Sequence, residues 1–499
     1  MNANLYALFE RHFPDSTEQP LLVIPNGPVI HYDDIAATSA RYANALMAAD
    51  CKPGDRVAVQ LDKDPRVLAL YLACLRAGLV YLPLNTGYQK TELRYFFTDA
   101  EPLVIVCNNA QLGTVASLAG SATVLTLDEL DERACALDST FDTVHSAPDD
   151  LAAILYTSGT TGRSKGAMLT HRNLASNALA LVEEWGFTRS DVLLHALPIY
   201  HVHGLFVAIH CVLLAGARML WLAKFDAREV VSLLPRASVM MGVPTFYTRL
   251  LTEPSFTREM AASVRLFVSG SAPLLAETFA AFEAHTGVAV LERYGMTETG
   301  MITTNPLQGA RVGGTVGKPL PGVNVRIVKD EAVDAAIGGV EVRGHNVFAG
   351  YWRMPEKTRE AFTADGYFRT GDMGEWVDAD PGRGYLRLIG RAKDLIITGG
   401  LNVYPKEIEE RIDDMEGVEE SAVIGIPHPD FGEAVTAVIV GLPGHTLTEA
   451  SIRAALKGEI ANFKVPKHVH IVDALPRNAM GKVQKTVLRE MFSRKPGSL

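Results

Sequence analysis

The sequence is poor in cysteine and lacks the close cysteine pairs that disulfide-rich or zinc-binding proteins use. Its five cysteines are scattered and odd in number: Cys51, Cys74, Cys107, Cys135 and Cys211. Their spacing therefore predicts neither a disulfide framework nor a zinc site. With 499 residues, 48% of them hydrophobic, the chain can bury a core that is stable without such cross-links.

Long hydrophobic runs and an excess of basic residues are also missing. The longest apolar stretch, residues 204–217, is interrupted by His210 and followed by Arg218, so it is too short for a membrane span. No basic segment with an apolar core follows Met1, so no signal peptide is expected. The net charge of −10 disfavours a general nucleic-acid binder. We expect a cytoplasmic protein that binds neither membranes nor nucleic acid.

Helices alternate with short apolar strands through the first 390 residues. Asp64 and Pro65 predict the start of a helix, as an acidic N-cap and a proline in the first turn, and Gly78 ends it. Short apolar runs predict strands at residues 79–82, 151–156, 264–269 and 288–291. This alternation is typical of an α/β fold built of layers with largely parallel sheets.

The pattern changes near residue 390. Residues 390–394 are charged, and shorter units follow them: a helix at 407–415 and strands at 422–426 and 435–440. We therefore predict a large N-terminal domain over residues 1–390, followed by a smaller α+β domain at the C-terminus.

A polar loop follows the predicted strand at 151–156. It comprises Thr157, Ser158, Gly159, Thr160, Thr161 and Gly162, and Lys165 lies shortly after it. Glycines let backbone N–H groups converge on an anion, hydroxyls add donors and the lysine adds charge, so the loop is a candidate polyphosphate site. It is not a Walker A loop, because Ser164 rather than glycine precedes Lys165. A polar linker without function is the alternative.

The same segment also fits the G-x-S-x-G pattern of serine hydrolases, from Gly162 to Gly166 with Ser164 as nucleophile. That nucleophile requires a tight turn from a strand into a helix. The residues between Tyr156 and Gly162 place Ser164 poorly for such a turn. A serine hydrolase is kept as the alternative from another functional class.

Six further motifs follow along the chain in a characteristic order. They are Pro198-Ile-Tyr-His-Val-His-Gly204, Tyr294-Gly-Met-Thr-Glu298, Gly350-Tyr-Trp-Arg-Met-Pro-Glu-Lys357, Tyr367-Phe-Arg-Thr-Gly-Asp372, Gly390-Arg391 and Pro476-Arg-Asn-Ala-Met-Gly-Lys482. With the polar loop, they resemble the adenylate-forming superfamily of acyl-CoA synthetases, firefly-type luciferases and carrier-protein adenylation domains. The resemblance covers nearly the whole chain. It implies a large N-terminal domain of layered α/β subdomains and a small, mobile α+β C-terminal domain.

The resemblance also implies a two-step reaction. A carboxylate displaces pyrophosphate from Mg²⁺-bound ATP to form an acyl-adenylate, and the thiol of coenzyme A then attacks that adenylate. Since the substrate itself is the nucleophile, the protein supplies positioning and charge stabilisation. Besides the polar loop and Lys165, the implied ATP or AMP contacts are Gly270, Ser271, Ala272, Tyr294, Gly295, Met296, Thr297, Asp372 and Arg391. The implied Mg²⁺ contacts are Glu298 and Thr157.

The catalytic residues that the resemblance implies are Lys482, Glu298 and Lys165. Of these, Lys482 would reach the substrate carboxylate and the α-phosphate. The implied hinge is residues 391–394 with Lys393 at its centre, and the C-terminal domain, residues 395–499, would rotate about it. That rotation would bring the residues of a CoA tunnel to the site: Gly399, Gly400 and Leu401. A lysine acetyltransferase acting on Lys482 is a further implied partner.

The acid substrate is suggested by Arg293, which precedes Tyr294 at a position where many relatives have a small residue. A buried arginine needs an anionic partner, and a second carboxylate on the substrate would supply one through a bidentate pair. This pattern is similar to that of malonyl-CoA synthetases, so we predict malonate, or methylmalonate, as the acid. Arg249 is a candidate second clamp, and the resemblance places His201 near the carboxylate.

The alternative is that Arg293 pairs with Glu292 or another acidic residue of the protein. In that case the enzyme would be a CoA ligase for a short-chain, medium-chain or aryl monocarboxylate.

Overall fold

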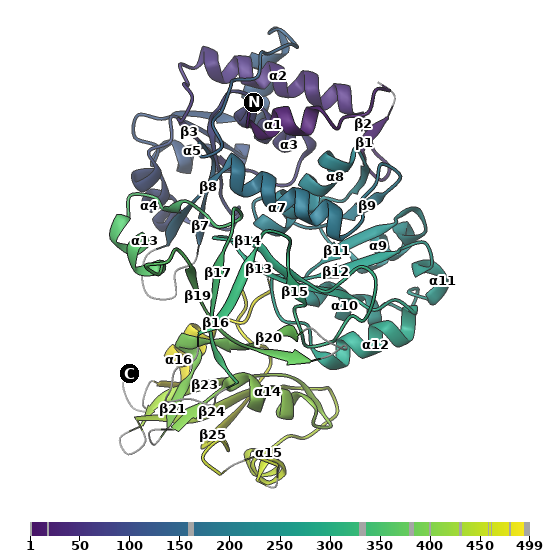
Figure 1. Ribbon diagram of the computed structural model, residues 1–499, viewed down its shortest axis with the longest axis vertical. Helices are drawn as coiled ribbons and strands as arrows, with labels where there is room; N and C mark the ends of the chain where they lie inside the picture. The colour runs from purple at the N-terminus through teal and green to yellow at the C-terminus, as the bar shows by residue number, and fades with distance from the viewer. Residues whose placement is uncertain are drawn as a thin grey trace. The chain divides into compact units, whose positions relative to one another are not determined.

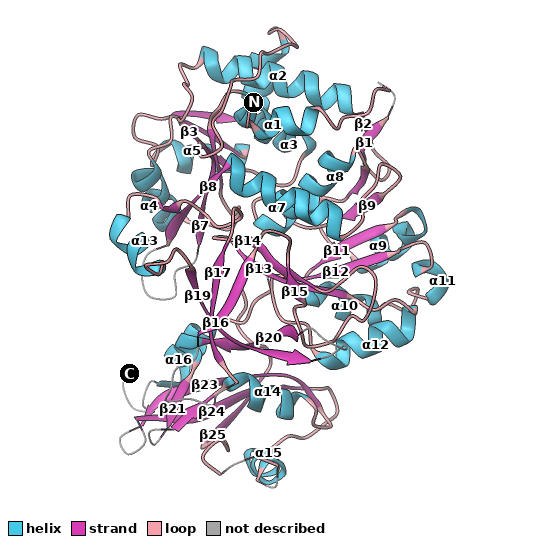
Figure 2. Ribbon diagram, viewed as in Figure 1, coloured by secondary structure: helices cyan, strands magenta, loops and turns pink. Residues whose placement is uncertain are grey.

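The computed structural model describes residues 2–16, 19–157, 164–328, 336–378, 384–398, 401–428, 432–457, 459–460, 462–478 and 481–493. The chain divides into two compact units. The first comprises Met1–Gly313, Gly317–Asn324 and Arg343–Gly366, and the second Gly314–Val316, Val325–Val342 and Tyr367–Leu499. Helices and strands alternate through the first unit (Figures 1 and 2), which confirms the expected mixed α/β class.

Two mainly parallel sheets form the first unit. One has the order β18 (Gly350–Tyr351), β8 (Lys165–Thr170), β7 (Leu151–Thr157), β4 (Val80–Pro83), β3 (Arg56–Gln60), β5 (Val104–Cys107) and β6 (Thr123–Thr126). The other has the order β15 (Lys318–Pro319), β14 (Gly300–Thr304), β13 (Leu291–Met296), β12 (Leu266–Ser269), β11 (Val239–Gly242), β9 (Val192–His195), β10 (Arg218–Trp221), β1 (Pro20–Val23) and β2 (Val29–His31). Antiparallel pairs occur only towards the ends of these orders, within the described residues.

The helical segments of the first unit are α1 (Leu5–Glu10), α2 (Tyr32–Ala48), α3 (Pro65–Arg76), α4 (Lys90–Ala100), η1 (Asn109–Gln111), α5 (Leu112–Ala116), α6 (Leu127–Cys135), α7 (His171–Glu184), η2 (His203–Ile209), α8 (His210–Ala215), α9 (Ala227–Leu233), η3 (Leu234–Arg236), α10 (Pro244–Leu251), α11 (Arg258–Ala261), α12 (Ala276–Thr286) and α13 (Pro355–Ala361). Among the described residues, no helix is both long and apolar enough to cross a membrane.

The second unit contains two sheets. One has the order β16 (Asn324–Val328), β17 (Gly338–Arg343), β19 (Phe368–Asp378) and β20 (Gly384–Arg391). The other has the order β22 (Leu401–Val403), β21 (Ile396–Thr398), β24 (Gly432–Gly441) and β23 (Val418–His428), with β25 (His468–Val472) also paired to β24. Its helical segments are η4 (Ala392–Asp394), α14 (Pro405–Asp413), α15 (Glu449–Leu456) and α16 (Lys485–Ser493).

The last segment of the second unit begins at Tyr367, well before the boundary near residue 390 that the sequence predicts. Strands β19 and β20 pair with each other from Asp372 and Arg391 to Asp378 and Gly384. Because of this pairing, β19 belongs to the same unit as β20, although it precedes the predicted boundary. The domain limits at 390 and 394 remain predictions.

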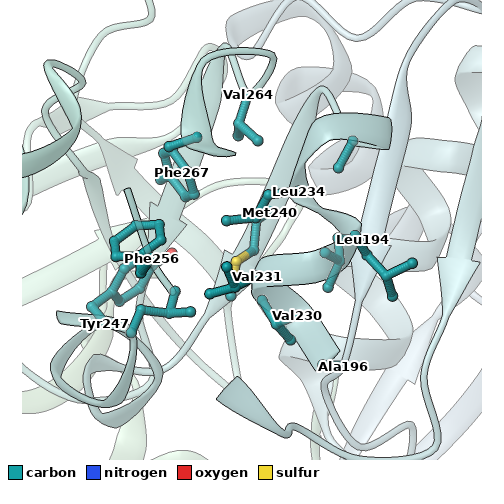
Figure 3. Packing of buried hydrophobic residues seen from close by; sticks show 14 of the residues in the cluster. Leu194, Ala196, Val230, Val231, Leu234, Met240, Tyr247, Phe256, Val264 and Phe267 are labelled. Carbon is teal, nitrogen blue, oxygen red and sulfur yellow. The ribbon is translucent and has the colours of Figure 1, made fainter. Parts of the chain in front are cut away.

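Apolar side chains pack against the second sheet of the first unit, between its strands and helices α9 to α12. Figure 3 shows part of this cluster, with Leu194 and Met240 from the strands beside Val230 and Phe256. Burial of such side chains is the main stabilising contribution to the unit.

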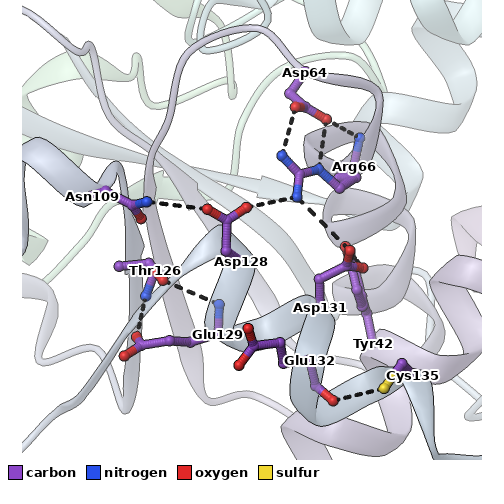
Figure 4. A network of polar contacts seen from close by, with 10 residues as sticks. All are labelled: Tyr42, Asp64, Arg66, Asn109, Thr126, Asp128, Glu129, Asp131, Glu132 and Cys135. Carbon is purple, nitrogen blue, oxygen red and sulfur yellow. Dashed lines mark hydrogen bonds and ion pairs between the residues drawn. The ribbon is translucent and has the colours of Figure 1, made fainter.

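Helix α3 begins as the sequence predicts. The Asp64 carboxylate accepts a hydrogen bond from the backbone N–H of Arg66 at 2.8 Å, and Gly78 after the helix has φ +67°. Figure 4 shows Arg66 joining Asp64 to Asp128 and Asp131, which ties α3 to α6. The strand predicted at 288–291 is wrong in position, since β13 starts at Leu291 and the residues before it pack as a loop against the core.

Candidate active site

Several predicted site residues lie at the carboxyl ends of neighbouring parallel strands. Strand β12 ends at Ser269 and pairs in parallel with β13, which carries Arg293. Ligands bind at this edge in open α/β sheets. Gly270 follows β12 directly, and a Cβ on it would overlap the guanidinium group of Arg293. The glycine therefore leaves the space that the Arg293 side chain occupies.

Arg293 is a buried cation, and two of its nitrogen atoms have no partner in the part of the chain that the structure describes. Its residue surface is 5% exposed, and Nε and Nη2 have no hydrogen-bond acceptor among the described residues. Burial lowers the pKa of the guanidinium to about 9, so it stays charged at neutral pH. A buried charge of this kind is costly unless it is paired. The environment of Arg293 therefore requires an anion.

The alternative in which Arg293 pairs with an acidic residue is wrong for the part of the chain that the structure describes. No ion pair joins Arg293 to a carboxylate there. Glu292 is opposite Ser269 on β12 and is adjacent to Arg293 along the same strand. Since successive side chains of a strand point to opposite faces, Glu292 is directed away from Arg293.

Two histidines, the half-buried His201 and the buried His203, are close enough to Arg293 for its charge to affect their pKa values. Burial and the Arg293 charge lower the pKa of His201 to about 4, and the pKa of His203 is lowered by the same two causes. Both imidazoles are therefore neutral. Nδ1 of His203 is hydrogen-bonded to the Ser271 hydroxyl at 3.2 Å, while its Nε2 is buried without a partner.

The sequence analysis preferred His201 and did not assign His203. The signal that could have found it is the H-x-H pattern, together with Ser271 in the segment after β12. Ser271 has φ +72°, a left-handed conformation that is uncommon for a residue with a side chain. The residue with this backbone conformation is the one whose hydroxyl is hydrogen-bonded to His203. His203 also starts η2, a π-helical segment of the kind often found at functional sites.

The structure corrects the assignment of Arg249 as a second group that binds the substrate carboxylate. Arg249 lies on α10, where Tyr247 and Leu250 face the core and Arg249 is exposed. It is two residues from Tyr247, and that spacing turns a side chain to the opposite side of a helix. Arg249 therefore does not face the same buried space as Arg293.

Lys165 and Glu298 are joined through an aromatic ring. The ammonium group of Lys165 is 4.5 Å from the ring centroid of Tyr351, and the Tyr351 hydroxyl donates to Oε1 of Glu298 at 3.1 Å. Glu298 is buried. Tyr351 was not assigned from the sequence, although it lies in one of the quoted motifs. It connects Lys165 to the turn between β13 and β14 that carries Glu298.

Of the polar loop, only its flanks are described. Thr157 ends β7, and its hydroxyl donates to the carbonyl of Lys165 at 3.4 Å. The other assigned members lie outside the described residues: Ser158, Gly159, Thr160, Thr161 and Gly162.

The serine-hydrolase alternative is contradicted by the strand pairing. Lys165 begins β8 directly after Ser164, and β8 runs antiparallel to β7. The segment therefore connects two strands of a hairpin, whereas a hydrolase nucleophile needs a helix after the turn. Ser164 also offers its carbonyl to the hydroxyl of Tyr95 at 2.7 Å.

The segment from Tyr294 to Glu298 continues β13 and leads to β14. A Cβ on Gly295 would overlap the carbonyl oxygen of Gly300 on β14, so this glycine is required by the close approach of two backbones. Tyr294 is buried, and Met296 ends the strand. Thr297 lines a small enclosed cavity. Ala272 lies in the half-buried segment after β12.

In the second unit, Asp372 and Arg391 are partners. They face each other across β19 and β20, and Nε of Arg391 is 2.7 Å from Oδ1 of Asp372. The backbone N–H of Asp372 donates to the Thr370 hydroxyl at 3.0 Å. Asp372 is buried. This pairing brings together two residues that the sequence assigned to nucleotide contacts.

Lys393 and Lys482 also belong to the second unit. Burial lowers the pKa of both ammonium groups, and for Lys482 the charge of Arg391 lowers it further. Lys482 is thus near Arg391 within this unit, in a hairpin outside any helix. Of the predicted CoA tunnel, Gly399 and Gly400 lie outside the described residues, and Leu401 begins β22.

Comparison with protein families gives two matches. The AMP-binding enzyme family matches residues 10–352, and the C-terminal domain of AMP-binding enzymes matches residues 407–482.

Individual relatives share most of the chain. It is 37% identical to the mitochondrial malonate–CoA ligase of Mus musculus, over 89% of this chain and 83% of that ligase. It is 35% identical to a feruloyl-CoA synthase of Amycolatopsis, over 93% of this chain and 94% of the synthase. Among solved structures, ATP-bound MatB from Rhodopseudomonas palustris is 54% identical with a TM-score of 0.95, over 99% of both chains.

Proposed function

The chain belongs to the AMP-binding enzyme family, and from that premise we propose that it is a malonate–CoA ligase. In the first step, a malonate carboxylate attacks the α-phosphate of ATP, and malonyl-adenylate and pyrophosphate form. In the second step, the thiol of coenzyme A attacks the adenylate, so that malonyl-CoA forms and AMP leaves.

The observation that carries the choice of acid is the unpartnered guanidinium of Arg293. Malonate has one carboxylate to react and a second to bind. The second carboxylate would accept hydrogen bonds from Nε and Nη2, the fork geometry that arginine offers. The malonate–CoA ligase relative and the structural likeness to ATP-bound MatB support the same assignment.

His203 suits the same carboxylate. If the Ser271 hydroxyl donates to Nδ1, the proton of the neutral imidazole resides on Nε2, which then is a hydrogen-bond donor. A neutral donor beside Arg293 adds to anion binding without repelling the cation. His201 is the second neutral histidine near Arg293.

The proposed nucleotide contacts are the ones that the resemblance implies. Lys165 and the polar loop would bind the phosphates, and the segment from Gly270 to Ala272 with Tyr294 to Thr297 would line the adenine and α-phosphate side. Asp372, with Arg391, would accept from the ribose hydroxyls. No protein nucleophile takes part, so the chain's contribution is orientation and stabilisation of the developing charge.

Mg²⁺ fits a site with a single carboxylate. No cluster of three or more His, Cys, Asp or Glu in the described ranges could hold a metal by itself. Mg²⁺ keeps several waters and binds one or two carboxylates together with substrate phosphates. Glu298, oriented by the Tyr351 hydroxyl, would be its carboxylate ligand, and Thr157 a hydroxyl partner. When bound, the ion neutralises charge on the phosphates.

Lys482 is proposed as the cation that stabilises adenylate formation, and Lys393 as the hinge about which residues 395–499 rotate. Coenzyme A would then enter beside Gly399, Gly400 and Leu401. Acetylation of Lys482 by a lysine acetyltransferase and a cytoplasmic location remain predictions, and the Mus musculus relative is a mitochondrial protein.

A monocarboxylate–CoA ligase is the second candidate, favoured by the feruloyl-CoA synthase relative. The two candidates differ in what Arg293 would contact. An aryl or alkyl chain would leave the guanidinium buried and unpaired, at the cost of a buried unsatisfied charge. We therefore rank the dicarboxylate first.

The test is a substrate panel with the purified protein, ATP, Mg²⁺ and coenzyme A. AMP and acyl-CoA are measured with malonate, methylmalonate, succinate, acetate, butyrate, benzoate and ferulate. We expect malonate to give the highest kcat/KM. A preference for ferulate or benzoate would establish the second candidate, and the absence of AMP with every acid would refute both.

A further inference from the structure

Lys482 lies in a short hairpin, and the described residues on both of its sides are joined by a bridge and by hydrogen bonds. Arg477 and Val483 form an antiparallel bridge across it. The backbone N–H of Asn478 donates to the carbonyl of Lys482, and the N–H of Lys482 donates to Oδ1 of Asn478, both at 2.9 Å. The position of the Lys482 side chain therefore follows the position of this hairpin.

The Arg477 side chain spans the hairpin and ties it to the sheet. Its Nη1 donates to the carbonyl of Gly481, the residue before Lys482. Its Nη2 forms an ion pair with Glu420 on β23. Both partners are partly buried, with side-chain exposures of 33% and 23%. One guanidinium thus connects the backbone beside Lys482 to a carboxylate outside the hairpin.

A second ion pair fixes the far end of the same segment. Lys485, at the start of α16, is 2.5 Å from Oε1 of Glu409 on α14. The same oxygen accepts the backbone N–H of Val423 on β23 at 2.8 Å. Helices α14 and α16 both pack on β23 (Figure 1). Glu409 is therefore part of the packing of this sheet, whereas Glu420 serves the hairpin through Arg477 alone among the contacts described.

We propose that the Glu420–Arg477 ion pair positions Lys482 for adenylate formation. The inference rests on the catalytic role proposed for Lys482. Neither Glu420 nor Arg477 is assigned to a substrate, so both are positioning residues. Without the Glu420 carboxylate, Arg477 is no longer held against the carbonyl of Gly481, and the ammonium group of Lys482 loses its fixed position.

The effect should appear in rate rather than in stability. A partly exposed ion pair contributes only about 0–1 kcal/mol to folding. A displacement of about 1 Å at a reacting centre can cost as much as roughly 100-fold in rate. Because Lys482 would act in the first step only, the second step should not respond.

The experiment is E420Q, which keeps the shape of the side chain and removes its charge. Malonate-dependent exchange of pyrophosphate into ATP reports the first step, and release of malonyl-CoA from freshly supplied malonyl-adenylate and coenzyme A reports the second. We expect the first rate to fall about 10-fold or more, the second to stay within twofold, and Tm to shift little. The matched control is E407Q, which breaks the 2.7 Å Glu407–Lys464 pair in the same unit without touching the hairpin, and both rates should be unchanged.

Equal losses in both steps, or an E420Q protein that behaves like E407Q, would overturn the proposal. R477K is the second variant, since it keeps the charge but cannot bridge Gly481 and Glu420 together, and the same split is expected. K482A is measured in parallel. If K482A retains exchange, the role of Lys482 in the proposed function fails; if K482A loses exchange while E420Q retains it, only the positioning inference fails.

Discussion

Arg265 and Arg293 belong to neighbouring parts of the same sheet in the first unit, and they differ in what they contact: Arg265 directly precedes β12, and Arg293 lies on β13 beside the end of β12. The guanidinium of Arg265 has acceptors within the protein: it donates to both carboxylate oxygens of Asp191 at 2.9 Å, and to the carbonyls of Trp185 and Gly186. Arg293 is more deeply buried and leaves Nε and Nη2 without an acceptor. Arg265 still has a side chain that is 32% exposed.

This difference in hydrogen-bond acceptors distinguishes an arginine that stabilises the fold from one that is suited to bind a ligand. A polar group that is buried without a partner costs roughly 1–3 kcal/mol, and more when charged. A fold would be expected to remove such a cost by supplying a partner, as it does for Arg265. At Arg293 the guanidinium instead lies against Gly270, which leaves room for it, and near the neutral histidines His201 and His203. The missing partner is therefore best explained as part of the substrate.

The largest expected effect is that of Arg293→Ala. It should raise the activation free energy that corresponds to kcat/KM with malonate by about 3–5 kcal/mol, the usual loss when one member of a buried ion pair is removed. The value of kcat/KM itself should then fall by roughly 100-fold or more. The rate with acetate should change far less, since acetate has no second carboxylate. Steady-state kinetics with both acids check this, and equal losses on both would contradict the comparison.

Arg265→Ala should have the opposite profile. It leaves the buried carboxylate of Asp191 without its cation, so the folded state should lose about 3 kcal/mol of stability. The ratio of malonate to acetate turnover should remain that of the wild type. Thermal unfolding and the two-acid assay measure both quantities. A changed acid preference would show that Arg265 also shapes the site.

Gly270→Ala tests the space rather than the charge. The added Cβ overlaps the guanidinium of Arg293, and overpacking of this kind costs typically about 1–3 kcal/mol. We expect malonate turnover to fall more than acetate turnover, by roughly tenfold. Combined with Arg293→Ala, the glycine substitution should add little, because the two changes act on one contact. Additive losses would mean that Gly270 acts elsewhere.

Asp413 extends the comparison to a half-buried carboxyl outside the site. One oxygen, Oδ1, is buried without a hydrogen-bond partner among the described residues, although the carboxyl group is hydrogen-bonded to Ser421, and burial raises its pKa to about 7. A carboxyl whose folded pKa is raised loses stability as the pH climbs from its unfolded pKa, about 4, towards 7. Asp413→Asn should therefore raise Tm by about 2–4 °C at pH 8, where the wild type is charged, and change it little at pH 4.

A pH-independent difference in Tm would contradict that account of Asp413. Malonate turnover should be unaffected, which distinguishes a carboxyl whose burial only lowers stability from an arginine that binds substrate.

Local signals in the sequence predicted the elements well where a cap or a periodic pattern marks them. The Asp64-Pro65 start of α3 is confirmed, and the helix predicted at 407–415 appears as α14, shifted by two residues. Strand β13 was misplaced because the apolar run at 288–291 also suits a buried loop. The expectation that Arg293 needs an anion came from the charge of arginine together with its position before Tyr294 in a family motif.

Contacts between distant segments could not be predicted in this way. Ser271 meets His203 across 68 residues, and Glu420 meets Arg477 across 57. Tyr351 was visible in a motif, but its link between Lys165 and Glu298 depends on the pairing of β18 with β8. Arg249 was misjudged because the sequence does not say which face of α10 is buried.

The most direct test of the central claim uses the unmodified protein with malonate and its monomethyl ester. The ester keeps the reactive carboxylate of malonate, replaces the second negative charge by a neutral ester group and is larger by one methyl group. If Arg293 binds that charge, pyrophosphate exchange with the ester should have a kcat/KM lower by about 100-fold or more, in line with the loss of a buried ion pair. Equal values for malonate and the ester would contradict the account.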